Sequence, residues 1–420
     1  MALASVIHDA VGAPARLRVT AFDGSSAGAD DAPLGLHLRT PLAVRYLISG
    51  GGSLGLTRAF VTGDLVLEGS AYDVLDAVTN TSSPEVKSSH RLAVVREAVR
   101  VAGLGVLVPL APPTEEVKLR GWRHSMRRDS AAISHHYDVS NRFYEYVLGP
   151  TMAYTCACYP RPDATLEEAQ FHKFDLVARK LALEPGMRLL DVGCGWGGMV
   201  MHAAKEYGVT ALGVTLSRQQ AEWAQKAIAD AGLSDRAEVR HLDYRLVTES
   251  GFDAVSSIGL TEHIGEKELP AYFSFLHSRL RPQGRLLNHC IMRPTTLEKA
   301  NIRNGFINRY VFPDGELEGL GTIVTAMQNN GFEVRHEENL REHYAQTLKH
   351  WCENLDAHWD EAVNEVGANK ARVWQLYMAG SRLGFDRRDI ELHQVLGVKT
   401  ENGESGFPLR SDWEPPTTGR

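Results

Sequence analysis

The segment that most constrains the fold is MRLLDVGCGWGGMVMHAAKEYG, residues 187–208, which has the pattern of an apolar strand, a glycine turn and a helix. Gly193, Gly195 and Gly197 permit tight backbone dihedrals and let a ligand approach the main chain, with helix N–H groups directed at it. Beyond residue 165, helix-like and strand-like segments alternate, which is typical of a doubly wound α/β sheet. We therefore predict a Rossmann-like α/β fold with a ligand at the glycine turn.

The glycine turn also fits the dinucleotide fingerprint, because Gly198 is a glycine too. A dinucleotide-binding enzyme needs an acid about twenty residues further on, at the end of the second strand, to bind the ribose. Here the second strand, TALGVTLSRQQ, ends in Thr215 and Ser217 with no acid before Glu222. The acid is instead Asp191, at the end of the first strand, so LLDVGCGWG resembles the first motif of an S-adenosylmethionine methyltransferase.

The chain as a whole is expected to have four parts. Residues 1–110 contain short alternating segments such as ARLRVTAFDG, separated by Gly, Asp and Ser, which predict a small α+β domain for lipid handling or oligomerisation. Residues 111–130 form a basic linker and residues 131–398 the methyltransferase domain. Residues 399–420 are polar and rich in Pro and Gly, which predicts a flexible tail.

Composition argues against several classes of protein. The formal net charge is −7, so the chain lacks the basic field of a nucleic-acid-binding protein. Five scattered cysteines do not make a disulfide framework and fit a reducing cytosol. The N-terminus has no signal-peptide pattern, and the longest apolar run, residues 101–113, is too short and too interrupted to span a bilayer. We expect a cytoplasmic protein that can still touch a membrane.

Seven motifs occur in an order that resembles one family. They are HHYDVSNRFYEYVLGPTMAYTCACY, LLDVGCGWGG, GVTLSRQQ, IGLTEHIG, GRLLNHCI, RYVFPDGEL and REHYAQTLKHW. Over about residues 130–395 the chain resembles the cyclopropane-fatty-acyl-phospholipid synthases, with the mycolic acid cyclopropane synthases and fatty-acid methyltransferases. The first hundred residues resemble the N-terminal domain of the longer bacterial members. One departure is Cys158, where the family often has an aromatic residue, and it affects the expected shape of the acceptor pocket.

The resemblance implies an enzyme that transfers the methyl carbon of S-adenosylmethionine to the cis double bond of an unsaturated acyl chain in a phospholipid. Methyl transfer leaves a carbocation in the lipid, and bound bicarbonate is expected to take its proton. Proton loss from the new methyl closes a cyclopropane. Proton loss from the chain after a hydride shift gives a methylene branch, which a partner reductase could convert to methyl. Both products stay open, and the resemblance also allows a homodimer through the N-terminal domain.

The resemblance implies a bicarbonate cage, which by motif comprises Cys156, Glu262, His289, Ile291 and Tyr344. Glu262 would accept a hydrogen bond from the bicarbonate hydroxyl, because a carboxylate and bicarbonate repel unless a proton lies between them. His289 and Tyr344 would donate to the other oxygens. The alternatives are that Glu262 is an ordinary acid at a helix N-terminus and that His289 is a satisfied core histidine.

The cofactor site implied by the resemblance comprises Tyr154, Thr155, Asp191, Gly193, Gly195, Gly197, Thr215, Leu216, Gln220, Asp243 and Tyr244. Asp243 would bind the adenine amino group and Tyr244 would cover the ring. The acyl tunnel would be lined by three aromatic residues that could equally be ordinary core, namely Phe306, Tyr310 and Phe312. We expect no metal, because the pair Cys156 and Cys158 has no second Cys/His cluster at zinc spacing.

The segment KLRGWRHSMRR, residues 118–128, has five basic residues, no acid and Trp122. Each basic residue near an anionic membrane surface is worth about 1 kcal/mol, and a tryptophan can anchor at the interface. We therefore expect peripheral binding at the inner face of the membrane, although the segment could be only a solvated linker.

Two other functions stay open. One is methylation of a small amine, since some plant N-methyltransferases share this catalytic domain, and the other is a non-catalytic lipid-binding protein. The N-terminal domain and the basic linker argue against the first. The intact glycine turn and the complete cage argue against the second.

Overall fold

The computed structural model of the chain describes residues 2–79, 88–117, 139–297, 305–313 and 315–413. The chain divides into two compact units. The small unit comprises residues 1–118, 301–313 and 355–383, and the large unit comprises residues 119–300, 314–354 and 384–420. The sequence placed 301–313 and 355–383 in the methyltransferase domain, but Phe306 and Leu376 pack into the core of the small unit.

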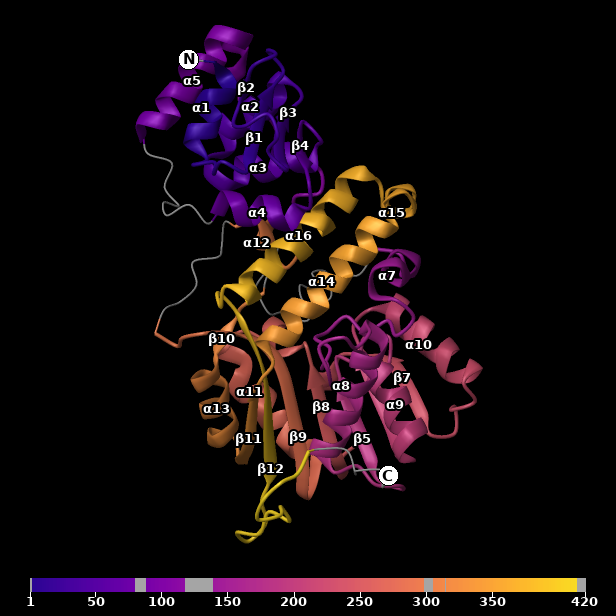
Figure 1. Ribbon diagram of the computed structural model, residues 1–420. Helices are drawn as coiled ribbons and strands as arrows, with labels where there is room; N and C mark the ends of the chain where they lie inside the picture. Colours follow the sequence, from indigo (N-terminus) through magenta and orange to yellow (C-terminus); the bar gives the residue numbers. More distant parts are fainter. Residues whose placement is uncertain (1, 80–87, 118–138, 298–304, 314, 414–420) are drawn as a thin grey trace. The chain divides into compact units, whose positions relative to one another are not determined.

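The small unit has a four-stranded sheet in the order β2-β1-β3-β4, which confirms the predicted α+β fold (Figure 1). Its strands are β1 Leu17–Ala21, β2 Ser26–Ala27, β3 Leu34–Leu38 and β4 Leu65–Glu68. Only the β1–β3 pair is parallel among these strands. The helices are α1 Leu3–Ala10, α2 Pro41–Gly50, α3 Gly52–Val61, α4 Ala71–Thr79, α5 Ser88–Ala102, α12 Phe306–Tyr310, α15 Trp359–Val366 and α16 Ala368–Asp386, with the last helix ending in the large unit.

The large unit contains a mixed sheet in the order β11-β12-β9-β8-β5-β6-β7, with the short β10 beside β9 (Figure 1). The strands are β5 Arg188–Val192, β6 Thr210–Thr215, β7 Ala237–His241, β8 Phe252–Ile258, β9 Leu280–Arg293, β10 Glu318–Gly319, β11 Phe332–Asn339 and β12 Glu391–Lys399. β12 is antiparallel to both β9 and β11, and the pairs from β9 to β7 are parallel. The predicted doubly wound α/β sheet is confirmed.

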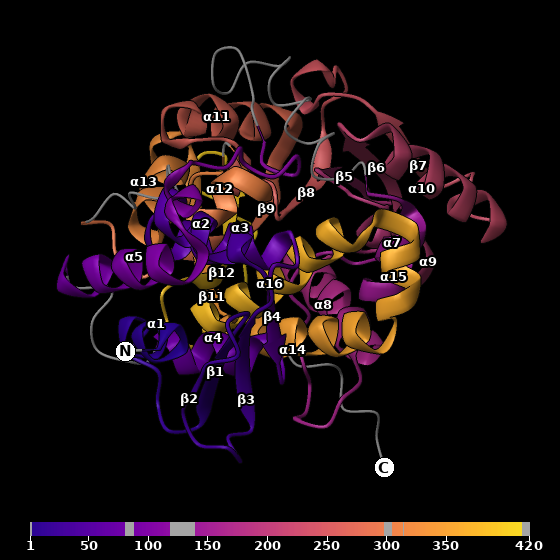
Figure 2. The same cartoon turned by 90° about the horizontal axis from the view of Figure 1, so that it is seen from above.

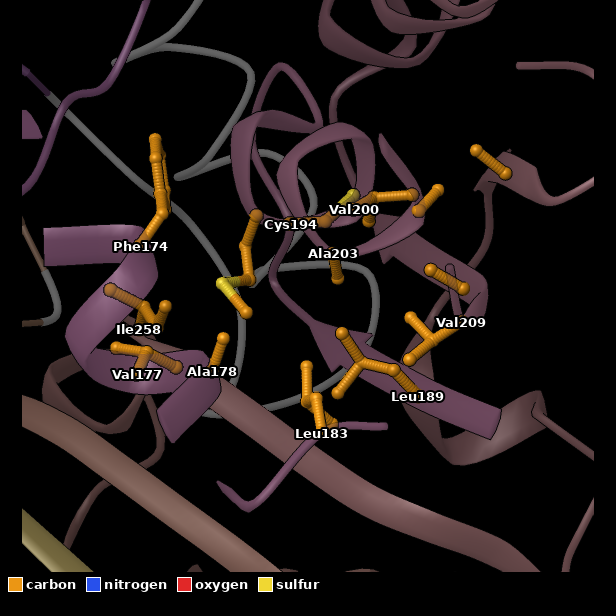
Figure 3. Packing of buried hydrophobic residues seen from close by; sticks show 14 of the residues in the cluster. Phe174, Val177, Ala178, Leu183, Leu189, Cys194, Val200, Ala203, Val209 and Ile258 are labelled. Atoms are coloured by element: carbon orange, nitrogen blue, oxygen red, sulfur yellow. The ribbon is translucent and has the colours of Figure 1, made fainter. Parts of the chain in front are cut away.

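Helices cover both faces of this sheet. One face carries α8 Leu166–Leu181, α9 Gly198–Tyr207 and α10 Arg218–Asp230, and the other carries α11 Leu269–Arg279 and α13 Leu320–Asn329. Successive side chains of a strand point to opposite faces of the sheet, and β5 illustrates this. Leu189 packs with the first set of helices and Leu190 with the second. Figure 3 shows the first core, with Leu189 among residues of α8 and α9. Figures 1 and 2 both show α11 beside α13.

The C-terminal segment is more ordered than its composition predicts. Phe407 and Trp413 pack against the core on the α8 side, and Arg179 Nε donates to the carbonyl of Trp413 at 2.8 Å. Two aromatic side chains thus hold a segment whose other residues are mostly polar. Phe407 and Trp413 thus lie against the core within the stretch that the composition predicted to be flexible, and the residues after 413 lie outside the described part of the chain.

Two expectations concern the membrane. Within the described ranges, no helix is long and apolar enough to cross a bilayer. The basic segment 118–128 lies outside the described residues.

Candidate active site

Two adjoining pockets, of about 540 and 670 Å³, open at the carboxyl ends of the parallel strands. Both are lined by Gly193 and Gly195 after β5, by Gly259 after β8, and by Gln220 of α10. Open α/β sheets bind ligands at this edge. The glycine turn therefore lies where the sequence predicted a ligand.

The three glycines of the turn have different roles, because Gly195 is open to a ligand and Gly197 is packed against other elements. All three have left-handed backbone conformations, with φ of 76° at Gly193, 54° at Gly195 and 80° at Gly197. A Cβ on Gly195 would meet nothing within 4 Å, so this backbone is open to a ligand. A Cβ on Gly197 would lie 3.2 Å from Cβ of Ala224, and Gly197 lines neither pocket. Gly197 thus serves the packing of α9 against α10.

Most of the predicted cofactor residues line the pockets, namely Tyr154, Thr155, Asp191, Gly193, Gly195, Thr215, Leu216, Gln220 and Tyr244. Asp243 does not line them. Its carboxylate accepts hydrogen bonds from the Arg245 side chain, at 2.9 Å to Oδ1 and 2.6 Å to Oδ2. Arg245 itself lines the pocket, so Asp243 orients a lining residue, and its role at the adenine amino group stays a prediction.

A buried acid and a buried base meet in the first pocket. Asp191 accepts a hydrogen bond of 2.6 Å from Ser256 Oγ, its neighbour on β8, and burial raises its pKa to about 6. Lys173 of α8 donates to Thr155 Oγ1 at 2.9 Å, and burial lowers its pKa to about 8. Opposite charges in one small pocket match the ammonium and carboxylate of an amino acid. The lining therefore fits the methionine end of S-adenosylmethionine.

Glu262 lies on the 3₁₀ turn Thr261–His263, which follows β8. Its Oε1 accepts a hydrogen bond of 2.7 Å from the N–H of Ile291 on β9. Its Oε2 is buried and has no hydrogen-bond partner among the described residues. Burial raises the pKa of this carboxyl to about 7. One carboxyl oxygen is thus held and the other has no partner among the described residues, and Glu262 lines neither of the two pockets.

His289, also on β9, is 1% exposed. Its Nδ1 lies 3.2 Å from Nε2 of Gln394, and its own Nε2 is buried with no partner in the part of the chain that the structure describes. Burial lowers its pKa well below the ordinary value, so the imidazole is neutral. The histidine is therefore only half satisfied, unlike an ordinary core histidine.

Two of the other cage residues, Cys156 and Tyr344, contact one backbone carbonyl. The thiol of Cys156 lies 3.8 Å from the carbonyl of Leu340, and the N–H of Tyr344 donates to the same oxygen at 3.1 Å. The N–H of Leu340 donates at 2.7 Å to Leu392, which is paired with Ile291 across the β9–β12 ladder. The Leu340 carbonyl thus joins Cys156 to Tyr344, while Ile291, whose N–H holds Glu262, lies opposite Leu392 in the ladder.

The surroundings of the Tyr344 ring and of the Cys156 thiol are defined by packing and by burial. The ring of Tyr344, at the start of α14 Arg341–Ala357, stacks on Phe385 at 4.5 Å. Burial raises the pKa of the Cys156 thiol well above its ordinary value and that of Cys158 to about 12, so both thiols are neutral. Among the described residues, no group of three or more His, Cys, Asp or Glu side chains is arranged to hold a metal ion.

The three aromatic residues predicted for the acyl tunnel belong to the small unit. Phe306 packs against its core, and the Tyr310 hydroxyl lies 3.3 Å from Glu116 Oε2. Phe312 makes an edge-to-face contact with Tyr377 at 5.8 Å. These contacts are the ones that core aromatics make, which was the alternative role considered for them.

Sequence reasoning missed the polar residues that α8 contributes. Gln170, Lys173 and Lys180 are buried on a helix whose other buried residues are mostly apolar. Their spacing of three and seven residues puts them on one face, together with Val177. Charged side chains on the apolar stripe of an amphipathic helix were the signal that could have identified them.

Sequence comparison with known proteins points to the same class of enzyme as the pocket. Residues 124–395 match the family model described as "Mycolic acid cyclopropane synthetase". A "Probable fatty acid methyltransferase" of Mycobacterium tuberculosis is 55% identical over 411 residues, which is 95% of each chain.

Two solved structures share the fold. The cyclopropane synthase MmaA2 from Mycobacterium tuberculosis has a TM-score of 0.61 and 33% identity, over 66% of this chain and 99% of that one. The mycolic acid cyclopropane synthase CmaA1, complexed with SAH and CTAB, has a TM-score of 0.61 and 34% identity, over 64% of this chain and 98% of that one. The chain therefore belongs to the mycolic acid cyclopropane synthetase family of S-adenosylmethionine-dependent methyltransferases.

Proposed function

We propose that this methyltransferase adds the methyl carbon of S-adenosylmethionine to the cis double bond of an unsaturated acyl chain in a phospholipid, with bound bicarbonate as the base. The name of the Mycobacterium tuberculosis relative supports a fatty-acid substrate. The CmaA1 complex contains CTAB, a surfactant with a long alkyl chain, which supports a lipid-like acceptor.

One observation carries the proposal, namely two buried polar atoms without partners among the described residues. Glu262 Oε2 can only accept a hydrogen bond when ionised, and His289 Nε2 is free for a ligand. Leaving a buried polar atom unsatisfied costs about 1–3 kcal/mol, so a small polar ligand would be bound here. Bicarbonate has both a hydroxyl donor and acceptor oxygens, which matches this pair.

In the proposed reaction the enzyme acts mainly by positioning the methyl donor against the alkene, and less by activating either of them. An alkene is a weak nucleophile without an acidic proton, so alignment of the reacting groups accounts for much of the barrier. S-Adenosylmethionine, when bound, supplies the methyl carbon, and Asp191 and Lys173 would hold its amino-acid end. Bicarbonate, when bound, supplies the base for the lipid cation. Glu262 would fix the orientation of the hydroxyl, and Ile291 N–H would keep that carboxylate in place.

The test is transfer of a labelled methyl group. The purified protein is incubated with methyl-labelled S-adenosylmethionine and vesicles of a cis-unsaturated phospholipid, and the acyl chains are analysed by mass spectrometry. We expect label in the unsaturated chains and none in matched vesicles of a saturated phospholipid. Label in small amines but not in lipid would contradict the proposal. No binding of S-adenosylmethionine would favour a non-catalytic lipid-binding protein.

Analysis of the labelled lipid would also show whether the product is a cyclopropane or a methylene branch. A ring-specific NMR signal would identify a cyclopropane, and its absence with retained label would identify a methylene branch. In the second case the proposal includes a partner reductase that yields the methyl branch. The proposal also places the enzyme at the inner face of the membrane, where its phospholipid lies, and allows a homodimer.

A further inference from the structure

Three polar residues form a row across neighbouring strands of the large unit. In the register of the sheet, Glu338 of β11 is paired with Gln394 of β12, and Gln394 is paired with His289 of β9. Residues directly opposite each other in a ladder project from the same face. Lys180 of α8 meets this row, because its Nζ bonds both Glu338 and Gln394.

The lysine decides which way the glutamine amide points. An ammonium only donates hydrogen bonds, and Lys180 Nζ lies 2.7 Å from Oε1 of Gln394. The amide nitrogen of Gln394 therefore faces His289, 3.2 Å from its Nδ1. The flipped amide would set its NH₂ group against the ammonium, donor against donor. Lys180, Gln394 and His289 are all buried, so water does not compensate for a wrong orientation of the amide.

The amide in turn decides which nitrogen of the imidazole carries hydrogen. Because the Gln394 NH₂ group donates, Nδ1 of His289 must be the acceptor, and a neutral imidazole then has its hydrogen on Nε2. Nε2 is the buried atom for which the described residues offer no partner. We propose that Gln394, oriented by Lys180, is a positioning residue that fixes His289 as the Nε2–H tautomer. The inference rests on the proposed function only where it takes this N–H to be the donor towards bicarbonate.

The tautomer can be observed without any assay. In full-length protein labelled with ¹⁵N-histidine, long-range ¹H–¹⁵N spectra distinguish protonated from unprotonated ring nitrogens, and comparison with His289→Gln identifies the His289 signals. The wild-type protein should show Nε2 protonated and Nδ1 unprotonated. In the near-isosteric variant Gln394→Glu, the carboxylate accepts and Nδ1 should become protonated. Wild-type protein with its hydrogen on Nδ1, or a variant with unchanged Nδ1, would overturn the inference.

Kinetics give a second measurement. Gln394→Glu should lower kcat about 10- to 100-fold, by analogy with the loss when the partner of a metal-ligating histidine is changed, while the KM for S-adenosylmethionine stays the same. A control for the change of amide to carboxylate is Gln225→Glu, at an exposed position where Nε2 donates to the carbonyl of Val239 at 2.8 Å, and it should change neither constant. An equal loss in both variants would contradict a positioning role.

The two proposals fail separately. If the spectra are as expected but no lipid is methylated, the tautomer assignment stands and the proposed function fails. If lipid is methylated while Nδ1 of His289 carries the hydrogen, the proposed function stands and the tautomer assignment fails. The wild-type spectrum also keeps the test decisive should Gln394→Glu not fold.

Discussion

A buried carboxyl group with only one oxygen hydrogen-bonded is costly, and Glu262 is such a group. The sequence predicted its place, because TEHIG directly follows an apolar strand. Family motifs, and not periodicity, singled out His289. Neither source could show the unsatisfied atoms or the amide of Gln394 behind the imidazole, because these depend on strands that are distant in the sequence.

The pKa of Glu262 leads to a prediction about pH. Burial raises this pKa to about 7, so the carboxyl is protonated below neutral pH and ionised above it. Only the ionised form can accept from Ile291 N–H and from a ligand hydroxyl together. We expect kcat to rise with pH through about 7 and then level off, measured at constant bicarbonate concentration. A flat or falling profile over this range would contradict the assignment.

At the scale of elements, α8 connects the two parts of the site. Lys173 reaches the cofactor pocket and Lys180 reaches the row behind His289. The sequence predicted a helix here and also the strand, glycine turn and helix that follow. It did not predict the buried lysines, since their burial depends on Thr155, Glu338 and Gln394, which come from other elements.

The strand β6 approaches the glycine turn closely, and this gives a stability prediction. A Cβ on Gly213 would lie 2.8 Å from Cys194 Sγ and 2.8 Å from Val200 Cγ2. Gly213→Ala should therefore destabilise the protein by about 1–3 kcal/mol, seen as a lower Tm. The control is Gly380→Ala in α16, where a Cβ meets nothing within 4 Å, and it should stabilise by about 0.5–1 kcal/mol. A Tm for Gly213→Ala at or above the wild-type value would refute the close approach.

At the scale of the whole molecule, the chain returns to the small unit after entering the large one. Glu116 accepts hydrogen bonds from Arg58 at 2.9 Å and from Arg309 at 2.5 Å, so an ion pair fastens α12, which contains Arg309, to the rest of the small unit. Local patterns predicted the α+β and α/β folds correctly. They could not assign 301–313 or 355–383 to a unit, because that depends on contacts between residues hundreds of positions apart.

The basic segment 118–128 gives a prediction about membranes. At about 1 kcal/mol per basic residue, changing its five to glutamine should weaken binding to anionic vesicles at low salt by roughly 10³- to 10⁴-fold. The measurement is vesicle sedimentation, with neutral vesicles for comparison. The matched control changes five exposed basic residues of the large unit to glutamine, namely Lys205, Lys226, Arg236, Lys267 and Lys349. Equal binding by both variants would show that the segment is only a linker.

The most direct test of the central claim is kcat as a function of bicarbonate concentration, for the wild-type enzyme and Glu262→Gln. The wild-type kcat should rise with bicarbonate and saturate. Glu262→Gln should lose about 10²- to 10⁴-fold and not respond to bicarbonate, while its Kd for S-adenosylmethionine stays unchanged by calorimetry. Glu268→Gln, at an exposed position six residues on, should behave as wild type. A Glu262→Gln variant with the kcat and bicarbonate response of the wild-type enzyme would contradict the account.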